Sequence, residues 1–169
     1  MLDRALERAP FFFGFKALNN ILVACALSCA VLSSSALAAS APATEVLSID
    51  AGKGSKSFYV EVVREEKDLN RGLMFRRHMA SDHGMLFDYD PPVEVAFWMK
   101  NTYIPLDIIF IDANGRILRI EENAKPLSLA HIPSGGEARG VLEINGGLSA
   151  NLGIGPGDVV HHALFQTAK

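Results

Sequence analysis

The fold is decided by residues 106–122, which read LDIIFIDANGRILRIEE. Residues 106–112 are apolar on both faces of an extended chain, and this pattern is typical of a central strand that is buried on two sides. Asn114-Gly115 separates this run from a second apolar run at 116–122. Asn-Gly between two such runs favours a β-hairpin because both residues tolerate positive φ. The middle of the chain is therefore predicted to be antiparallel β-structure.

Further strand signals, rich in β-branched and aromatic residues, extend outward from this hairpin. They cover residues 45–50, 57–64, 84–87, 93–100, 137–145 and 158–165. Residues 65–70 and 146–152 favour short helices, whereas residues 125–136, with two prolines and a Gly-Gly pair, predict a long surface loop. Seven or eight short strands with little helix indicate a mainly β domain. We expect a small antiparallel β-barrel or a jelly-roll-like sandwich with one or two short helices.

Residues 1–38 have the features of a secretory signal peptide. A region with basic residues precedes an apolar run at 21–32, and Ala36-Leu37-Ala38 supplies the small residues that signal peptidase requires. We predict cleavage near Ala38, a flexible tether over residues 39–44 and a single β-rich domain over residues 45–169. The mature protein is then expected in the periplasm or outside the cell.

Two alternatives exist for this N-terminal segment. A membrane anchor needs about 20 apolar residues, and this run is shorter and ends in Ser33-Ser34-Ser35, so no stable membrane span is expected. A lipoprotein would be anchored through Cys25, because Leu22-Val23-Ala24-Cys25 resembles a lipobox. The apolar run continues past that cysteine, whereas a lipobox should close it, and this favours cleavage near Ala38.

Composition excludes several classes of function. Both cysteines, Cys25 and Cys29, lie in the signal segment, so the mature domain would contain no disulfide and no thiolate metal site. The histidines lack metal-ligand spacing, and no phosphate loop, dinucleotide fingerprint or nucleophile elbow occurs, so no cofactor is expected. The formal net charge of −3 gives no electrostatic reason to expect nucleic acid or an anionic membrane surface as a partner. We expect a monomer.

The stretch Trp98–Thr102 contains the first candidate site residues. Trp98 and Lys100 would share one face of a strand, where an indole and a fixed positive charge can form one wall of a pocket. Asn101 and Thr102 follow directly and complete this candidate wall. The alternative is structural: Lys100 extends along Trp98 into solvent, while Asn101 and Thr102 satisfy the backbone of a turn.

Two carboxylates, Asp107 and Glu143, occur inside otherwise apolar strands. A buried carboxylate is costly unless it is paired, so each requires a cation or several hydrogen-bond donors. Arg71 or Lys100 is the expected partner of Asp107, and Arg139, four residues away on the same strand face, is the expected partner of Glu143. These groups would form a polar cluster that serves as an ion-pair network, a ligand site or a catalytic acid and base.

Several blocks together resemble one known family. In order, they are Arg71-Gly72-Leu73-Met74-Phe75-Arg76, Gly84-Met85-Leu86-Phe87, Phe97-Trp98-Met99-Lys100-Asn101-Thr102, Ile104-Pro105-Leu106-Asp107-Ile108-Ile109-Phe110-Ile111-Asp112, Val141-Leu142-Glu143-Ile144-Asn145-Gly146-Gly147 and Gly157-Asp158. Over residues 46–165 this order and spacing resemble domain of unknown function 192, also called uncharacterised protein family 127. The resemblance implies a single small β-barrel or jelly-roll-like domain, often exported, with no established activity.

Three functional hypotheses follow. The leading one is an exported binding or accessory module that holds a small polar or anionic ligand, or an envelope partner. Its pocket would be formed by Arg71, Trp98, Lys100, Asn101, Thr102, Asp107 and Glu143. The second hypothesis is a hydrolase or lyase on envelope saccharide that uses Asp107 and Glu143 as acid and base, and the third is a purely structural domain.

Overall fold

The structure is a computed structural model that describes residues 43–165. The predicted signal peptide at 1–38, its cleavage near Ala38 and the alternative anchor at Cys25 lie outside the described residues and remain predictions. Within residues 43–165, neither helix has the length and apolar character needed to cross a membrane.

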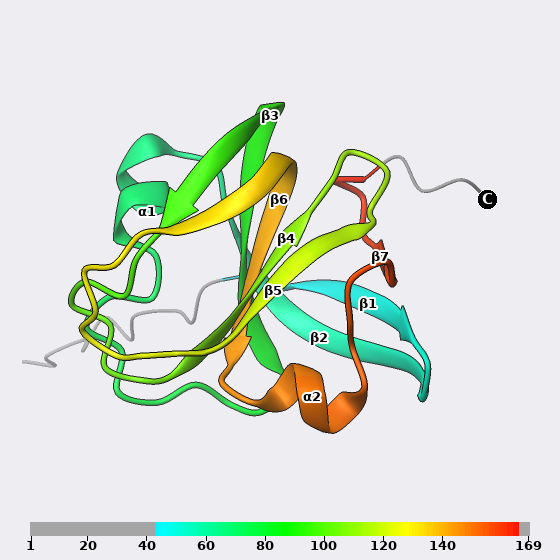
Figure 1. Cartoon of the computed structure of the whole chain (residues 1–169), viewed down its shortest axis with the longest axis horizontal. Coiled ribbons are helices and arrows are strands. Elements are labelled where there is room, and N and C mark those ends of the chain that lie inside the picture. The colour runs from blue at the N-terminus through cyan, green and yellow to red at the C-terminus, as the bar shows by residue number, and fades with distance from the viewer. Residues whose placement is uncertain (1–42, 166–169) are drawn as a thin grey trace, which may run out of the picture. The chain divides into compact units, whose positions relative to one another are not determined.

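The described chain consists of strands with two short helices (Figure 1). The elements are β1 (Glu45–Ala51), β2 (Gly54–Val63), α1 (Glu66–Arg71), β3 (His83–Phe97), β4 (Leu106–Ile111), β5 (Ile117–Ala124), β6 (Ile132–Asn145), α2 (Leu148–Leu152) and β7 (Val159–His161). The mainly β fold class with two short helices is therefore confirmed.

The seven strands form one curled sheet in the order β5-β4-β6-β3-β2-β1-β7. All neighbouring pairs are antiparallel except β2 and β3, which are parallel. This departs from a fully antiparallel barrel because residues 64–82, including α1, form a crossover long enough to return the chain to the same direction. At one end, a bridge between Arg116 and Val159 joins the two sheet edges, and Val160 N donates to Gly115 O at 2.7 Å.

Some predicted strand boundaries are wrong. The predicted strands at 84–87 and 93–100 are one long strand, β3, because a register shift between Asp88 and Val93 absorbs Pro91 and Pro92 as a bulge. The predicted loop at 125–136 ends at residue 131, since Ile132 pairs with Phe97 and begins β6. The predicted last strand at 158–165 is only three residues long, β7.

The hairpin at 106–122 forms as predicted. All six residues of β4 are buried, and the strand lies between β5 and β6 with a hydrophobic cluster on each face. In the connecting turn only Gly115 has positive φ, at 79°. Asp112 stabilises this turn, because its Oδ1 accepts hydrogen bonds from the backbone of Asn114 and Arg116, both at 2.8 Å.

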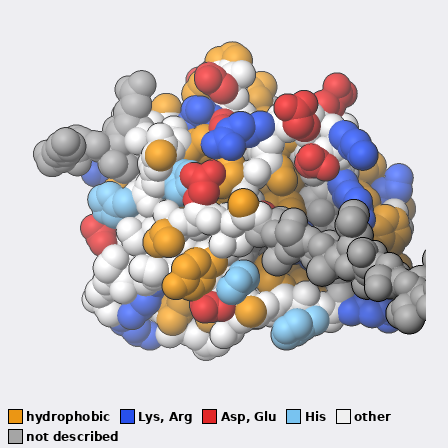
Figure 2. All heavy atoms as spheres, turned by 180° about the vertical axis from the view of Figure 1, so that it is seen from behind, with side chains coloured by type: hydrophobic (Ala, Val, Ile, Leu, Met, Phe, Trp, Pro, Cys, Tyr) orange, Lys and Arg blue, Asp and Glu red, His pale blue; other side chains and the backbone are white. Residues whose placement is uncertain are grey.

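The surface mixes charges of both signs on the reverse face of the molecule. Figure 2 shows Lys and Arg side chains interspersed with Asp and Glu side chains there. Such mixing creates no extended field of one sign, in keeping with the small formal net charge of −3.

Gly84 marks the tightest approach of β3 to β6. A Cβ atom at this position would lie 2.7 Å from the backbone oxygen of Glu143, which cannot move without breaking the sheet. We expect Gly84→Ala to destabilise the domain by about 2–3 kcal/mol through overpacking. Urea denaturation measures this, and Gly155→Ala is the matched control because nothing lies within 4 Å of its Cβ position. Equal stability of the two variants would contradict the prediction.

Candidate functional site

A cavity of about 540 Å³ opens beside the end of β3. Its walls come from the segment after α1, from residues 96–102 and from β6. Six of the seven predicted site residues line it: Arg71, Trp98, Lys100, Asn101, Thr102 and Glu143. The structure therefore brings together most of the candidate residues in one pocket, and only Asp107 lies elsewhere.

Trp98 and Lys100 form one side of the pocket. β3 ends at Phe97, and the ammonium of Lys100 lies 5.0 Å from the centre of the Trp98 ring, which is a cation–π contact. The Trp98 side chain is 42 % exposed although it is the largest apolar group nearby. A half-exposed indole beside a cation presents an apolar surface and a positive charge to the same ligand.

Asn101 and Thr102 each bond to a backbone group, which is the kind of contact that the structural alternative expects of them. Asn101 has φ of 56°, and its carbonyl accepts a hydrogen bond from Phe75 N at 2.8 Å. The buried Thr102 hydroxyl donates to Lys100 O at 3.3 Å. These contacts fix the turn that holds Lys100 over Trp98.

Arg71 ends α1 at the rim of the pocket and is exposed. Among residues 43–165 no hydrogen bond or ion pair engages its guanidinium. Gly72 follows with φ of 47° and ψ of −137°, and a Cβ atom there would lie 3.0 Å from Phe87 Cζ. Only glycine permits this close passage of the chain over Phe87, and the passage places Arg71 at the pocket mouth.

Glu143 lies within the pocket wall on β6 and is only 5 % exposed. Its Oε2 atom is buried and has no hydrogen-bond partner among the described residues. Burial raises the pKa of the Glu143 carboxyl to about 8, while the charge of Arg76 acts in the opposite direction. Near neutral pH the group is therefore mostly protonated and can both donate and accept a hydrogen bond.

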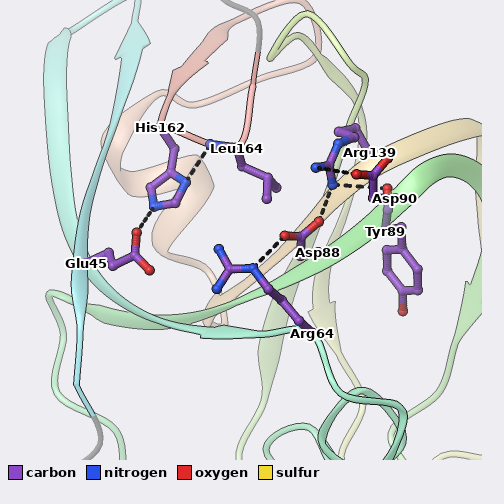
Figure 3. A network of polar contacts seen from close by, with 8 residues as sticks. All are labelled: Glu45, Arg64, Asp88, Tyr89, Asp90, Arg139, His162 and Leu164. Atoms are coloured by element: carbon purple, nitrogen blue, oxygen red, sulfur yellow. Dashed lines mark hydrogen bonds and ion pairs between the residues drawn. The ribbon is translucent and has the colours of Figure 1, made fainter.

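The predicted pairing of Glu143 with Arg139 is wrong. Arg139 instead forms an ion pair with Asp88 and donates to Tyr89 O at 3.1 Å, as Figure 3 shows. The bulge of β3 places these acceptors beside Arg139, so they compete successfully for its guanidinium. Arg64 also contacts Asp88, at 2.8 Å, and none of the charged groups of this ion-pair network lines the pocket.

Arg76 and Glu61 are the site neighbours that sequence reasoning missed. Glu61, Met85 and Glu143 lie in register across β2, β3 and β6. Arg76 binds both oxygens of Glu61 at 2.5 Å and lines, with Glu61, a second cavity of about 560 Å³. Sequence spacing does not reveal this arrangement, because the strand register and the loop after α1 bring together residues that lie far apart along the chain.

Asp107 faces the other side of the sheet. In the pairing of β4 with β6, Asp107 lies opposite Ile144, whereas Ile108 lies opposite Glu143, so the two carboxylates point to different faces. Asp107 accepts three backbone hydrogen bonds at 2.8 Å, from Asn123, Gly147 and Ser149. The expected partners Arg71 and Lys100 are therefore wrong, and the requirement for several donors is met by backbone groups of β5 and of the start of α2.

This arrangement limits the chemistry of the site. The acid and base pair that the saccharide hypothesis requires, Asp107 with Glu143, is not formed, because the two side chains lie on opposite sheet faces. Within residues 43–165, no three His, Cys, Asp or Glu side chains gather as a metal site. What the pocket does combine is an indole, two exposed cations and one neutral carboxyl group.

The comparison with protein-family models matches residues 46–162 to DUF192, described as "Uncharacterized ACR". The chain belongs to the DUF192 family. Comparison with curated proteins found no match. Every site residue named above lies within the residues that match the family model.

Two crystal structures have the same fold as this DUF192 domain. One is a protein of unknown function from Novosphingobium aromaticivorans DSM 12444, with 40 % identity and a TM-score of 0.70 over 73 % of this chain and 94 % of that one. The other, from Sinorhizobium meliloti 1021, was provisionally called a transcription regulator. It has 42 % identity and a TM-score of 0.71 over 75 % of this chain and 98 % of that one. Both consist almost entirely of the shared domain, which shows that this fold forms on its own.

Proposed function

We propose that this DUF192 protein is an exported binding or accessory module whose pocket beside Trp98 holds a small ligand from the cell envelope. One observation carries the proposal: six polar or aromatic residues singled out from the sequence line a single open cavity of about 540 Å³. A structural domain has no need of such a cavity, because its polar groups can pair with one another in a closed core.

The groups in the pocket define the class of ligand. Arg71 and Lys100 supply positive charge at the rim, which favours a carboxylate or phosphate. Trp98 offers an apolar face for a sugar or hydrocarbon ring. The unpaired, mostly neutral Glu143 carboxyl requires a group that accepts or donates a hydrogen bond, such as an amide or hydroxyl. A small acid that also carries a neutral polar group satisfies all three.

The exported location rests on the sequence of residues 1–38. The apolar run at 21–32 and the Ala36-Leu37-Ala38 motif favour a cleaved signal peptide, and an exported domain would meet its ligands in the envelope or outside the cell. The N-terminal sequence of the protein purified from the periplasmic fraction would test this, because cleavage near Ala38 leaves residue 39 or a close neighbour as the first residue.

Two other functions have less support. A catalytic role for Glu143 lacks a second free carboxylate in the pocket, since Asp107 is on the far face and Glu61 is bound to Arg76. Gene regulation, the role in the provisional name of the Sinorhizobium meliloti relative, would require DNA binding. A net charge of −3 does not favour it.

Trp98 itself provides the test, because it is the single tryptophan of the chain. We expect N-acetylmuramic acid, which has a carboxylate and an amide, to change the Trp98 fluorescence in a saturable manner. N-acetylglucosamine, which lacks the carboxylate, should bind at least about tenfold more weakly, since a hydrogen bond to a charged group contributes about 1.5–3 kcal/mol. Titration of the tryptophan emission measures both affinities.

The matched variants are Lys100→Ala in the pocket and Lys53→Ala in the turn between β1 and β2. Lys100→Ala should lower the affinity for the acidic probe by about tenfold and leave the affinity for the neutral probe unchanged. Lys53→Ala should alter neither, because Lys53 lies outside the pocket. The proposal is abandoned if neither probe alters the emission, or if the two lysine variants behave alike.

A further inference from the structure

Three loops of the domain lie side by side and are joined by backbone hydrogen bonds. We call residues 74–79, 98–104 and 125–131 the loop face; they gather at the end of the sheet drawn on the left in Figure 1. The bonds run from Phe75 N to Asn101 O (2.8 Å), from Leu127 N to Thr102 O (3.1 Å) and from Met99 N to Ser128 O (3.0 Å). The middle loop bonds to both of its neighbours, so the three loops adjoin one another.

The loop face is unusually apolar for a surface. Of the eight large hydrophobic side chains that are exposed among the described residues, five belong to it, and they are between 42 % and 64 % exposed. They are Phe75, Trp98, Tyr103, Leu127 and Leu129. Single exposed hydrophobic residues are ordinary on protein surfaces, but a group of five on adjoining loops indicates a contact surface.

Backbone strain occurs at the same place. Phe75 and Leu127 have φ values of 66° and 63°, in the left-handed region that bulky residues rarely adopt. Their exposed side chains gain little from packing inside the domain, so the fold does not recover the cost of this conformation there. Strain that the interior does not explain is typical of residues kept for an external contact.

The charge of the loop face is opposite in sign to that of the whole chain. Its three segments contain Arg77, Lys100 and Lys125, together with Arg76, whose charge Glu61 balances. They contain no aspartate or glutamate, although the chain has more acidic than basic residues. Arg77 lies 5.3 Å from the Tyr103 ring, in the same kind of contact that Lys100 makes with Trp98. The net charge of the whole chain does not show this local excess of basic residues. For that reason the net charge gave no reason to expect an anionic surface as partner.

We propose that the loop face docks on an anionic phospholipid bilayer. Phe75, Leu127 and Leu129 enter the boundary between head groups and acyl chains, where Trp98 and Tyr103 lie with their polar edges in the head-group layer. Arg77, Lys100 and Lys125 contact the lipid phosphates, and each basic residue near such a surface adds to binding through its charge. Charge complementarity, together with apolar side chains on loop tips, favours this partner over an acidic protein.

Docking can be separated from ligand binding in the pocket. Arg77, Tyr103, Leu127 and Leu129 line neither cavity, so variants at these positions change the loop face alone. Leu127→Asn is especially informative, since asparagine tolerates the left-handed conformation better than leucine. This substitution should preserve or raise the melting temperature while it removes an apolar contact with the bilayer.

The experiment is co-sedimentation of residues 40–169 with vesicles, a span that keeps the whole shared domain and omits the apolar N-terminal run. One set contains equal parts of phosphatidylglycerol and phosphatidylcholine, and the other contains phosphatidylcholine alone. We expect binding to the anionic vesicles and at least about tenfold weaker binding to the neutral ones. The double variant Leu127→Asn, Leu129→Ser should lose at least about tenfold in partitioning to anionic vesicles. Val46→Ser, at an equally exposed valine on β1, should lose none.

Several results would overturn the proposal. One is failure to bind the anionic vesicles, which would leave an acidic protein as the partner that the surface fits. Another is equal binding to both vesicle types or equal binding by the double variant. A third is a concentration-dependent dimer in sedimentation velocity that the double variant abolishes, because the loop face would then join two copies of this chain.

Discussion

Asp107→Ala is expected to destabilise the domain by about 4 kcal/mol or more. The substitution leaves three backbone N–H groups without an acceptor, one of them buried and two partly buried, and each such group costs about 1–3 kcal/mol when it is cut off from water. Two of these groups, in Gly147 and Ser149, belong to the start of α2, and the third, in Asn123, belongs to β5. The variant therefore loosens the junction between these elements, and urea denaturation followed by circular dichroism measures the loss.

Asp112→Ala is the matched control, because Asp112 also accepts backbone hydrogen bonds, from Asn114 and Arg116, but in an exposed turn. Water replaces an acceptor in such a turn, so we expect a cost of about 1 kcal/mol or less. A cost for Asp107→Ala no larger than this would show that the buried bonds do not hold α2 in place. Asp107→Asn, which keeps one acceptor oxygen, should fall between the two.

Glu143→Gln is expected to make the domain more stable than the native protein in alkaline solution. The pKa of Glu143 is raised from an ordinary value of 4.5 to about 8 by burial. The folded state therefore binds the Glu143 proton more tightly than the unfolded state does. The native protein loses this contribution progressively as the pH rises above 4.5 and through 8. Glutamine has no proton to lose in this pH range, so the stability of the variant does not fall in this way.

The melting temperature of both proteins between about pH 5 and about pH 9 provides the measurement. Relative to the native protein, the variant's free energy of unfolding should rise by roughly 4 kcal/mol across this range, with the two proteins nearly equal at the acid end. Glu137→Gln, an exposed glutamate on the same strand, serves as the control and should not show this gain. Parallel curves for Glu143→Gln and native protein would mean that Arg76 already holds Glu143 ionised in the folded state.

Local signals explain why the sequence predicted the centre of the fold. The β4–β5 hairpin is encoded within residues 106–122 by a doubly buried strand and an Asn-Gly turn. The parallel pairing of β2 with β3 and the continuity of β3 through Pro91 depend instead on contacts between distant segments. Propensity and turn residues do not specify such contacts, so these features were not predictable.

One side of the pocket was also predictable from local signals, whereas the position of Asp107 on the far face of the sheet was not. Trp98 and Lys100 are two residues apart, so their contact is local, although a turn after the end of β3 makes it and not the predicted strand. Whether Asp107 and Glu143 share a sheet face depends on the register of β4 against β6, and a shift of one residue reverses the answer. Nothing within either strand specifies that register, so the two acids were grouped incorrectly.

The bridge between Arg116 and Val159 has a consequence for synthesis and assembly. The sheet order places β1 and β7, the first and last strands of the described sheet to leave the ribosome, next to each other. A nascent chain therefore cannot join the two edges of the curled sheet until residues 159–161 have left the ribosome. A chain truncated before Val159 would expose unpaired backbone along β1, which pairs with β7, and at the start of β5. Such open edges recruit strands from other molecules into aggregates.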